Sequence, residues 1–366
     1  MGMIKKNIAL AAVMAIACGT ASASEDYDLR YAPGIGGADM SAPFEGGWVF
    51  QAHAYFYSGN VRTASQTVTD LTRAPFNTPI PGANAVTTIT ANTQINVYGL
   101  LPRLSYMSGK TFLGATLGGT VLLPLINKKN HASVTGISTV VNAPGLSPAI
   151  ADFIAASITN NPLVVDPANL VAAANSNSNE GPGDIEFSPI LRWSTDNTQT
   201  LFIATVVAPT GDYESDRAAN PSAGKFWTFR PAVQYSYIGN GWDFGGRAAY
   251  SFNTTNSQTH YHTGNYLNLD VTVMKSLSDS FRIGGAGYAV VQTTRDTRSE
   301  APTSPIIEVR QDVTLEQKGH VYGIGPELAY IHGAGDYLLD GRIMKEFGAS
   351  YRPEGFTAVV TLSKPF

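Results

Sequence analysis

The last twelve residues, GFTAVVTLSKPF at positions 355–366, decide the fold class. Apolar side chains recur at every second position from Phe356 to Leu362, and the stretch ends on the aromatic Phe366. Period-two alternation puts one set of side chains on each face of a strand, which is how a transmembrane β-strand separates lipid from lumen. A terminal aromatic in that register is typical of bacterial outer-membrane barrels. Taken alone, the twelve residues also fit an edge strand of a soluble sheet.

The opposite end of the chain indicates export. Residues 1–23 have the three parts of a secretory signal: a charged start at Lys5 and Lys6, an apolar core over 8–17, and a small-residue cleavage site at 21–23. We therefore expect the mature chain to begin near Ser24.

The only cysteine, Cys18, lies inside that signal. A lipoprotein in which Cys18 becomes the acylated first residue is an alternative, but Ala15, three residues earlier, is a poor match for the usual large aliphatic residue. Cleavage after residue 23 leaves no thiol, which excludes disulfides, thiolate metal sites and cysteine nucleophiles.

Composition favours a protein embedded in lipid. Only 14% of the 366 residues are charged, well below the roughly 25% of ordinary soluble domains. No segment after the signal approaches the 18 or so apolar residues of a spanning helix. Removal of Lys5 and Lys6 moves the formal charge from −4 to −6, and this mild acidity without a basic stripe argues against a nucleic-acid partner.

Period-two alternation between turn signals predicts twelve strands, and an even count suits a single-chain bacterial barrel. The sequence thus predicts an all-β fold, a 12-stranded antiparallel transmembrane β-barrel with long extracellular loops and short periplasmic turns. The predicted strands are about 48–58, 87–101, 111–123, 185–195, 200–209, 226–238, 242–253, 264–276, 281–293, 320–332, 338–348 and 355–366.

The connections between these strands alternate long and short, which a soluble sandwich has no reason to do. We expect residues 1–23 to be the signal peptide, 24–47 a periplasmic N-terminal segment, and 48–366 the barrel. Within the barrel, 124–184 is expected to be a long extracellular loop with short helices.

Strand parity predicts which polar side chains face the lumen, although strands 111–123 and 200–209 are apolar on both faces and cannot be oriented. For each candidate, a structural ion pair or hydrogen bond is a simpler interpretation than contact with a solute. Both charge signs occur, so the lumen need not select strongly between anions and cations. The lumen-lining candidates are Gln51, His53, Gln94, Asn96, Glu186, Arg192, Arg230, Gln234, Asp243, Arg247, Asp270, Arg282, Tyr288, Glu327, Asp340 and Arg342.

The stretch from Gly181 to Phe187, followed by Trp193 and by residues 208–213, resembles the outer-membrane protein family of meta-pathway phenol degradation. Residues 32–34 and 47–59 look like that family's opening and 362–366 like its close, whereas the insertion over 124–180 has no match. The resemblance implies an outer-membrane barrel that transports aromatic or other apolar small molecules. It supplies no catalytic or ligand-contact residues.

The long loop carries two helix start signals, Ser147-Pro148 and Asp166-Pro167. The first predicted helix has apolar residues at helical spacing, and covering them at the barrel mouth would make a lid or constriction. A helical cap, an intersubunit contact or a disordered insertion are alternatives. The candidates for the constriction are Ile150, Phe153, Ile154 and Ile158.

An enzyme is not expected. His260 and His262 lie in an external loop without a paired carboxylate at ligand spacing, which is a weak metal site. No nucleophile motif such as Gly-x-Ser-x-Gly occurs. We therefore expect no catalytic residues, no metal and no cofactor.

The sequence therefore predicts an outer-membrane channel for passive uptake of small, apolar or aromatic solutes. The alternative is a structural or surface-interaction barrel, an adhesin or receptor that uses its long outer loops. The expected location is the outer membrane of a Gram-negative cell. The expected partners are membrane lipid and lipopolysaccharide, the barrel-assembly machinery through Phe366, and a small solute; the oligomeric state is left open.

Overall fold

A closed antiparallel barrel dominates the computed structural model, which describes residues 24–41, 46–72, 80–302, 304–312, 314–333 and 335–366. Twelve of the described strands close the barrel, because β1 pairs with β2 on one edge and with β16 on the other. The predicted fold class is therefore confirmed. In barrel order the strands are β1 (Gly47–Asp70), β2 (Asn84–Phe112), β3 (Ala115–Leu122), β6 (Glu186–Ser194), β7 (Thr198–Val207), β8 (Thr228–Gly239), β9 (Trp242–Asn253), β11 (Tyr266–Ser276), β12 (Phe281–Gln292), β14 (His320–His332), β15 (Tyr337–Ser350) and β16 (Glu354–Pro365).

The two ends of the barrel differ. At one end, here named the turn end, strands are joined by short connections such as 113–114 between β2 and β3 and 240–241 between β8 and β9. At the other, the loop end, the connections run to 208–227 and 293–319. The predicted alternation of long and short connections is present. The bounds predicted for β9 and β14 coincide with the observed ones.

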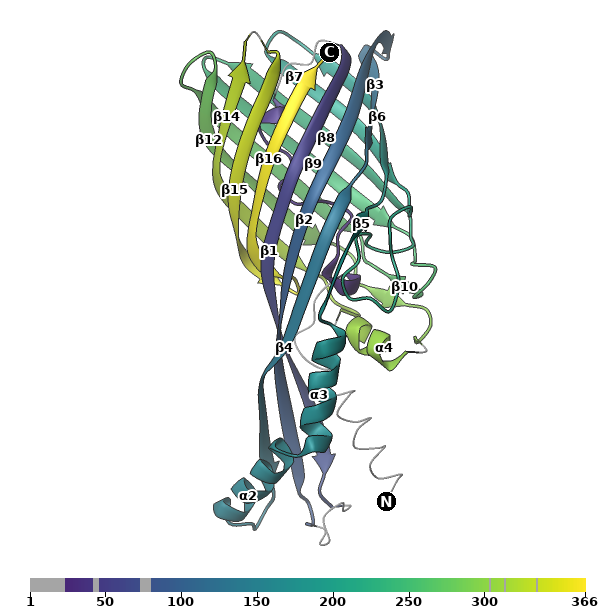
Figure 1. Cartoon of the computed structure of the whole chain (residues 1–366), viewed down its shortest axis with the longest axis vertical. Coiled ribbons are helices and arrows are strands. Elements are labelled where there is room, and N and C mark those ends of the chain that lie inside the picture. Colours follow the sequence, from purple (N-terminus) through teal and green to yellow (C-terminus); the bar gives the residue numbers. More distant parts are fainter. Residues whose placement is uncertain (1–23, 42–45, 73–79, 303, 313, 334) are drawn as a thin grey trace.

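Part of the barrel wall continues past the loop end as an extended sheet (Figure 1). β1 and β2 stay paired as far as Asp70 and Asn84, and β4 (Leu125–Asn142) follows β2 along its other edge. β5 (Asn177–Pro182) then pairs with β4. The prediction of a loop over 124–184 is therefore wrong at both ends of that range, where β-strands extend the wall.

Between β4 and β5 lie two helices, α2 (Pro148–Thr159) and α3 (Pro162–Ala174). α2 begins directly after Ser147, as expected. α3 begins earlier than expected, because Asn161 caps it by accepting a hydrogen bond of 3.0 Å from the backbone N–H of Leu163. Pro167 lies inside that helix.

The remaining elements are short. Two 3₁₀ turns, η1 (Glu25–Tyr27) and η2 (Ala38–Met40), lie in the N-terminal segment. β10 (Tyr261–His262) and β13 (Thr297–Arg298) pair within the loops at the loop end, and α4 (Pro305–Asp312) follows them. Among the described residues, no helix is both long and apolar enough to cross a bilayer.

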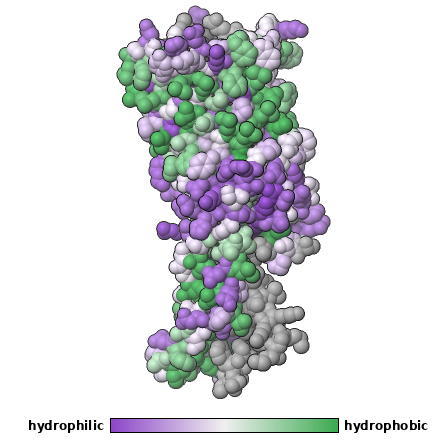
Figure 2. All heavy atoms as spheres, in the orientation of Figure 1, coloured by the Kyte–Doolittle hydropathy of each residue, from purple (hydrophilic) through white to green (hydrophobic). Residues whose placement is uncertain are grey.

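Many large apolar side chains are exposed on the outside of the barrel, and Figure 2 shows them on one face. Aromatic pairs mark both rims of this surface: Trp48 and Tyr106 lie 4.7 Å apart near the turn end, and Phe56 and Phe356 lie 5.3 Å apart near the loop end. In Figure 2 a hydrophilic belt follows below the apolar surface, at the level of the loops. An apolar band between aromatic girdles is how an outer-membrane barrel meets lipid and its two interfaces.

Candidate functional site

The N-terminal segment, residues 24–41, lies inside the barrel and not beside it in the periplasm as the sequence suggested (Figure 1). Ser24 contacts Asp296 at the loop end, and Ala38 contacts Glu327 on β14. The physical reason is the lumen itself: a twelve-stranded wall with buried charges has to be filled or solvated, and this segment supplies the partners. We name residues 24–41 the inner segment.

Backbone groups of the inner segment are bound by charged and polar side chains of the wall. Arg342 on β15 donates from Nε to the carbonyl oxygen of Gly34 at 2.8 Å. Glu327 accepts from the backbone N–H of Ala38 at 2.6 Å, and Gln234 donates to the carbonyl oxygen of Met40 at 3.1 Å. These bonds satisfy backbone N–H and C=O groups of the inner segment, which has little regular structure of its own.

Glycine is required where the inner segment meets the wall. Gly34 has φ +75°, a left-handed conformation that L side chains rarely adopt. A Cβ there would also collide with Cε of Met344 and lie 2.8 Å from the ring of Tyr288. Position 34 therefore requires glycine, which has no side chain.

Ion pairs complete the attachment. Arg30 of the inner segment pairs with Asp184 at 3.1 Å, and its guanidinium lies 4.0 Å from the ring centre of Phe226. Asp270 on β11 pairs with Arg247 at 3.1 Å and accepts hydrogen bonds from the Tyr31 hydroxyl and, at 3.1 Å, from the backbone N–H of Gly34. Each of these charges is compensated within the lumen, as a buried charge must be.

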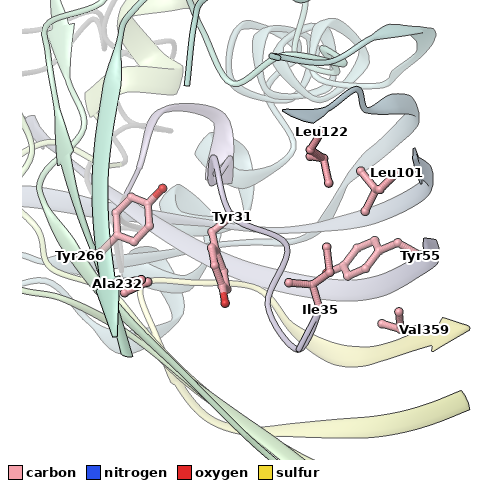
Figure 3. Close-up of a cluster of buried hydrophobic side chains, with 9 residues drawn as sticks. Tyr31, Ile35, Tyr55, Leu101, Leu122, Ala232, Tyr266 and Val359 are labelled. Carbon is pink, nitrogen blue, oxygen red and sulfur yellow. The ribbon is translucent and has the colours of Figure 1, made fainter. Parts of the chain in front are cut away.

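An apolar cluster surrounds the middle of the inner segment (Figure 3). Tyr31 and Ile35 meet wall residues that come from both sides of the barrel. The wall members are Tyr55, Leu101, Leu122, Ala232, Ala249, Tyr266 and Val359. The inner segment packs against the wall here as residues of a hydrophobic core do. It therefore divides the lumen.

A cavity of about 1120 Å³ remains beside the inner segment. Its lining extends from residues 220–223 in a loop at the loop end to Asp279 and Gly333 in turns at the turn end. Between these ends it follows inward residues of β1, β2, β3, β6, β7, β8 and β9. Arg282 on β12, Glu346 on β15 and Ser363 on β16 also line it, as do residues of the inner segment, so the cavity extends alongside the inner segment between the two ends.

Fourteen of the sixteen predicted lumen residues divide into two groups. One group lines the cavity: Gln51, Glu186, Arg192, Arg230, Gln234, Arg247 and Arg282. The other is buried away from it, in contacts with the inner segment or with neighbouring strands: His53, Asp243, Asp270, Tyr288, Glu327, Asp340 and Arg342.

Contacts within the second group are specific. Tyr288 donates to Glu346 at 2.8 Å, and His53 lies 3.0 Å from the hydroxyl of Thr361 through Nδ1. Asp243 pairs with Arg282. Tyr288, His53 and Asp243 therefore hold the wall together behind the cavity lining, to which their partners Glu346 and Arg282 belong.

The inward orientation predicted for Gln94 and Asn96 is wrong. On β2 the cavity is lined by Ile95 and Val97, and the two polar residues alternate with them on the outer face. Asn96 is paired in register with Ser58 near the loop end, where the outer face leaves lipid and polar residues are tolerated. Toward the rim of the barrel, polar residues therefore lie on the outer face and apolar residues on the inner face. Strand parity alone does not predict this reversal.

The two strands that the sequence could not orient are oriented by the structure. On β3, Thr120 and Leu122 face the cavity and Val121 is exposed outside. On β7, Ile203 lines the cavity, whereas the neighbouring Phe202 is 40% exposed on the outer face.

The predicted lid does not lie in the barrel mouth. Ile158 on α2 is buried against Leu71, Ala83 and Ala85 at the far end of the extended sheet, and Ile154 packs on the same cluster. Ile150 and Phe153 are exposed there. The placement of Ile150, Phe153, Ile154 and Ile158 as a constriction is therefore wrong, because the extension of β1, β2 and β4 carries α2 away from the lumen.

The residues that narrow the lumen do not stand out in the sequence. The inner segment has no period-two pattern, and only a periplasmic segment is predicted there. Its glycine-rich stretch, Gly34-Ile35-Gly36-Gly37, was the available signal, since glycines at this density allow close backbone approach. Arg103, Leu101 and Ile203, which line the cavity, were not predicted either.

The closed twelve-stranded wall and the aromatic girdles define the class: an outer-membrane β-barrel. Residues 78–362 match the family described as "Putative MetA-pathway of phenol degradation", and the chain belongs to that family. No protein with a curated description matches the sequence significantly.

Among solved structures, the chain is similar to the COG4313 outer membrane channel from Pseudomonas putida F1, with a TM-score of 0.56 and 12% identity over 91% of this chain and 100% of that one. This likeness supports the fold. CymD, a monoaromatic hydrocarbon channel, aligns at 8% identity over 94% of this chain and 98% of its own with a TM-score of 0.38. A Pseudomonas aeruginosa FadL homologue aligns at 9% over 89% and 91% with a TM-score of 0.37, and neither of these two comparisons adds to the fold argument.

Proposed function

We propose that this protein is an outer-membrane channel through which small, apolar or aromatic solutes cross passively. The observation that carries the proposal is the cavity that runs beside the inner segment from the loop end to the turn end. Membership of a family described by phenol degradation supports an aromatic solute. Side chains fill the interior of an eight-stranded barrel, whereas porins with 16 to 18 strands enclose an aqueous channel. The lumen of a twelve-stranded barrel is intermediate in width.

The lining of the cavity suits a molecule with an apolar body and a polar group. Leu101, Leu201 and Ile203 offer apolar contact, whereas Arg103 and Arg192 place guanidinium groups along the same cavity. A pocket with mostly apolar walls and a few polar groups binds small organic molecules in this way, with the polar groups fixing orientation. Phenol and related hydroxyaromatics have both parts.

Two substitutions on β7 test whether the cavity conducts. Ile203→Trp adds a bulky side chain to the cavity wall, whereas Phe202→Trp changes the adjacent residue on the lipid face. In planar bilayers we expect Ile203→Trp to lower single-channel conductance several-fold and Phe202→Trp to leave it at the wild-type value. Equal conductance in all three proteins would show that ions take another path.

The solute class is tested in the same bilayers. Millimolar phenol added to the loop side should cause transient blocking of the wild-type current, and erythritol at the same concentration should not. If both solutes have the same effect, or neither has any, the preference for aromatic solutes is wrong even if the cavity conducts.

The surface-interaction alternative is not favoured, because the family and the fold point to channels. The same comparisons support a passive role without a catalytic step.

A further inference from the structure

Asp296, in the loop between β12 and β13, is a buried carboxylate with an unusual set of partners. It is fully buried and accepts hydrogen bonds from the backbone N–H of Ser24 at 2.6 Å, the backbone N–H of Gly264 at 2.7 Å and the Tyr261 hydroxyl at 2.7 Å. The Gln292 side chain also donates to it. All four donors are neutral.

Other buried carboxylates of this barrel have a cation beside them, such as Asp270 with Arg247 and Asp184 with Arg30. In the described part of the chain, no Lys, Arg or His forms an ion pair with Asp296. Burial accordingly raises the pKa of the Asp296 carboxyl to about 6, even though the hydrogen bonds from Gly264 and Tyr261 act in the opposite direction. A buried carboxylate without a cation is costly, and this one lacks its cation.

One of the four donors to Asp296 is the backbone nitrogen of Ser24, 2.6 Å from the carboxylate, and the sequence independently marks the 23–24 bond as the expected cleavage site of the signal peptide. Hydrolysis of that bond consumes one water, leaves a carboxylate on Ala23 and converts the Ser24 amide nitrogen into a primary amine, which takes up a proton at neutral pH. The single N–H that now faces Asp296 would become an ammonium group with three N–H donors.

We propose that removal of the signal peptide creates the cation that Asp296 lacks, so that the α-ammonium of Ser24 is bound in a pocket formed by Asp296, Tyr261, Gly264 and Gln292. The pocket is therefore a receptor for the mature amino terminus of the chain itself. Cleavage fastens the inner segment at the loop end, in addition to the contacts of Gly34 and Ala38 deeper in the lumen.

The backbone of Ser24 is consistent with this order of events. In the uncleaved chain Ser24 has φ 81° and ψ 138°, a conformation that is unfavourable for a residue with a side chain. The φ angle is defined by the preceding carbonyl carbon. Cleavage removes that carbon, and the strain disappears with it.

The other charged groups near this pocket do not supply the missing cation to Asp296. Glu25, the next residue, is a second buried carboxylate, which accepts hydrogen bonds from Asn256, Thr259 and Gln311. Arg352 contacts the side chain of Ser24, with Nη1 3.4 Å from the serine hydroxyl. Farther out, Arg295 pairs with Glu316 at an exposed position.

The experiment measures the reactivity of the α-amine. Wild-type protein is produced with its own signal, purified folded from outer membranes, and treated with an acetylating N-hydroxysuccinimide ester, and the labelled N-terminal peptide is quantified by mass spectrometry. We expect the chain to begin at Ser24 and its α-amine to be labelled about tenfold more slowly in the folded protein than after unfolding, because a nearby carboxylate favours the unreactive charged form.

Two variants separate this pocket from general protection by the barrel. Asp296→Asn removes the carboxylate and should restore fast labelling, whereas Asp196→Asn, at an exposed turn-end position, should behave as wild type. A threonine inserted between Ala23 and Ser24 moves the amine out by one residue while Asp296 stays, and it should also be labelled fast. Folding of every variant is checked by its faster migration in unheated gels.

A mature chain that starts at any other residue would overturn the proposal. So would folded wild type, Asp296→Asn and the insertion variant labelling at the same rate. If Asp296→Asn does not fold, the insertion variant alone decides between the two outcomes. None of these readouts depends on whether the barrel transports a solute.

Discussion

Arg342 and Gly34 are joined across the lumen: Nε of the arginine on β15 donates a hydrogen bond of 2.8 Å to the carbonyl oxygen of the glycine in the inner segment. The same guanidinium also donates to the carbonyl oxygen of Ile35 and pairs with Asp340. Wall and inner segment therefore form one hydrogen-bonded unit, and a change on either side should be felt on the other.

Replacing Gly34 should widen the conducting path. In Gly34→Ala the new Cβ collides with Met344 and Tyr288, and the residue is held in a left-handed conformation. Gly82→Ala is a matched control, because Gly82 has nearly the same φ, +72°, but no atom lies within 4 Å of the place its Cβ would take. Single-channel conductance should rise several-fold in Gly34→Ala and stay unchanged in Gly82→Ala. An equal change in both would mean that backbone strain, and not displacement of the inner segment, is responsible.

Removing the guanidinium of Arg342 should destabilise the barrel strongly. Arg342→Met leaves Asp340 and Glu327, both fully buried, without the cation between them, and breaking a buried ion pair from one side costs about 3–5 kcal/mol. Arg295→Met breaks only an exposed pair with Glu316 and should cost less than about 1 kcal/mol. Urea unfolding in lipid vesicles measures both. Similar midpoints for the two variants would show that Arg342 is not needed to compensate Asp340 and Glu327.

The pH dependence of stability should distinguish chains with and without the bound amino terminus. In the uncleaved chain, where a neutral N–H faces the carboxylate, burial raises the pKa of Asp296 to about 6, above its ordinary value of 3.8. We expect the pKa to be raised in the same way in the variant with threonine inserted before Ser24, because the nitrogen of Ser24 is again an amide there. The folded state then holds a proton that the unfolded state has released, so this contribution to stability is fully present below about pH 4 and is lost as pH rises through 6. In the wild type the ammonium favours the charged carboxylate, and this loss should not occur.

The measurement is the difference in urea midpoint between wild type and insertion variant at pH 4, 5, 6 and 7. We expect the difference to grow as the pH rises. A difference that stays constant over this range would show that Asp296 does not titrate in the insertion variant.

Two valine substitutions test where the barrel meets lipid. Val271, in the middle of β11, is 51% exposed on the outer face, and Val271→Arg should cost about 2–4 kcal/mol at the bilayer midplane. Val140, near the end of β4, is 61% exposed on the extended sheet, and Val140→Arg should be nearly neutral because that face meets water. Unfolding in vesicles reports both. Comparable losses would mean that the extended sheet is also embedded.

The barrel could be predicted from the sequence because the alternation of apolar and polar residues that indicates it lies within each strand. On β9 and β11 each residue alternates between lipid and interior, so the spacing of Phe244, Leu269 and Val271 was sufficient to place them outside. β2 shows the limit of that reasoning. It leaves the membrane part-way along its length, and from there Asn96 on the outer face and Ile95 on the inner face reverse the usual distribution of polarity.

The inner segment could not be predicted in the same way, because its position depends on partners far away in the chain. Gly34 is held by Arg342 and Asp270, which lie hundreds of residues later and on different strands. The sequence of a short stretch without periodicity does not predict such contacts. The charges on the wall were identifiable, but the backbone that compensates them was not.

The extended sheet has a consequence for the surface of the cell. From Asn60 to Asp70, the antiparallel strand β1 extends over about 34 Å. The tip of the extended sheet near α2 is therefore far from the bilayer. We expect that tip to lie outside the cell, so an epitope placed at Gly145 should be reached by antibodies on living cells.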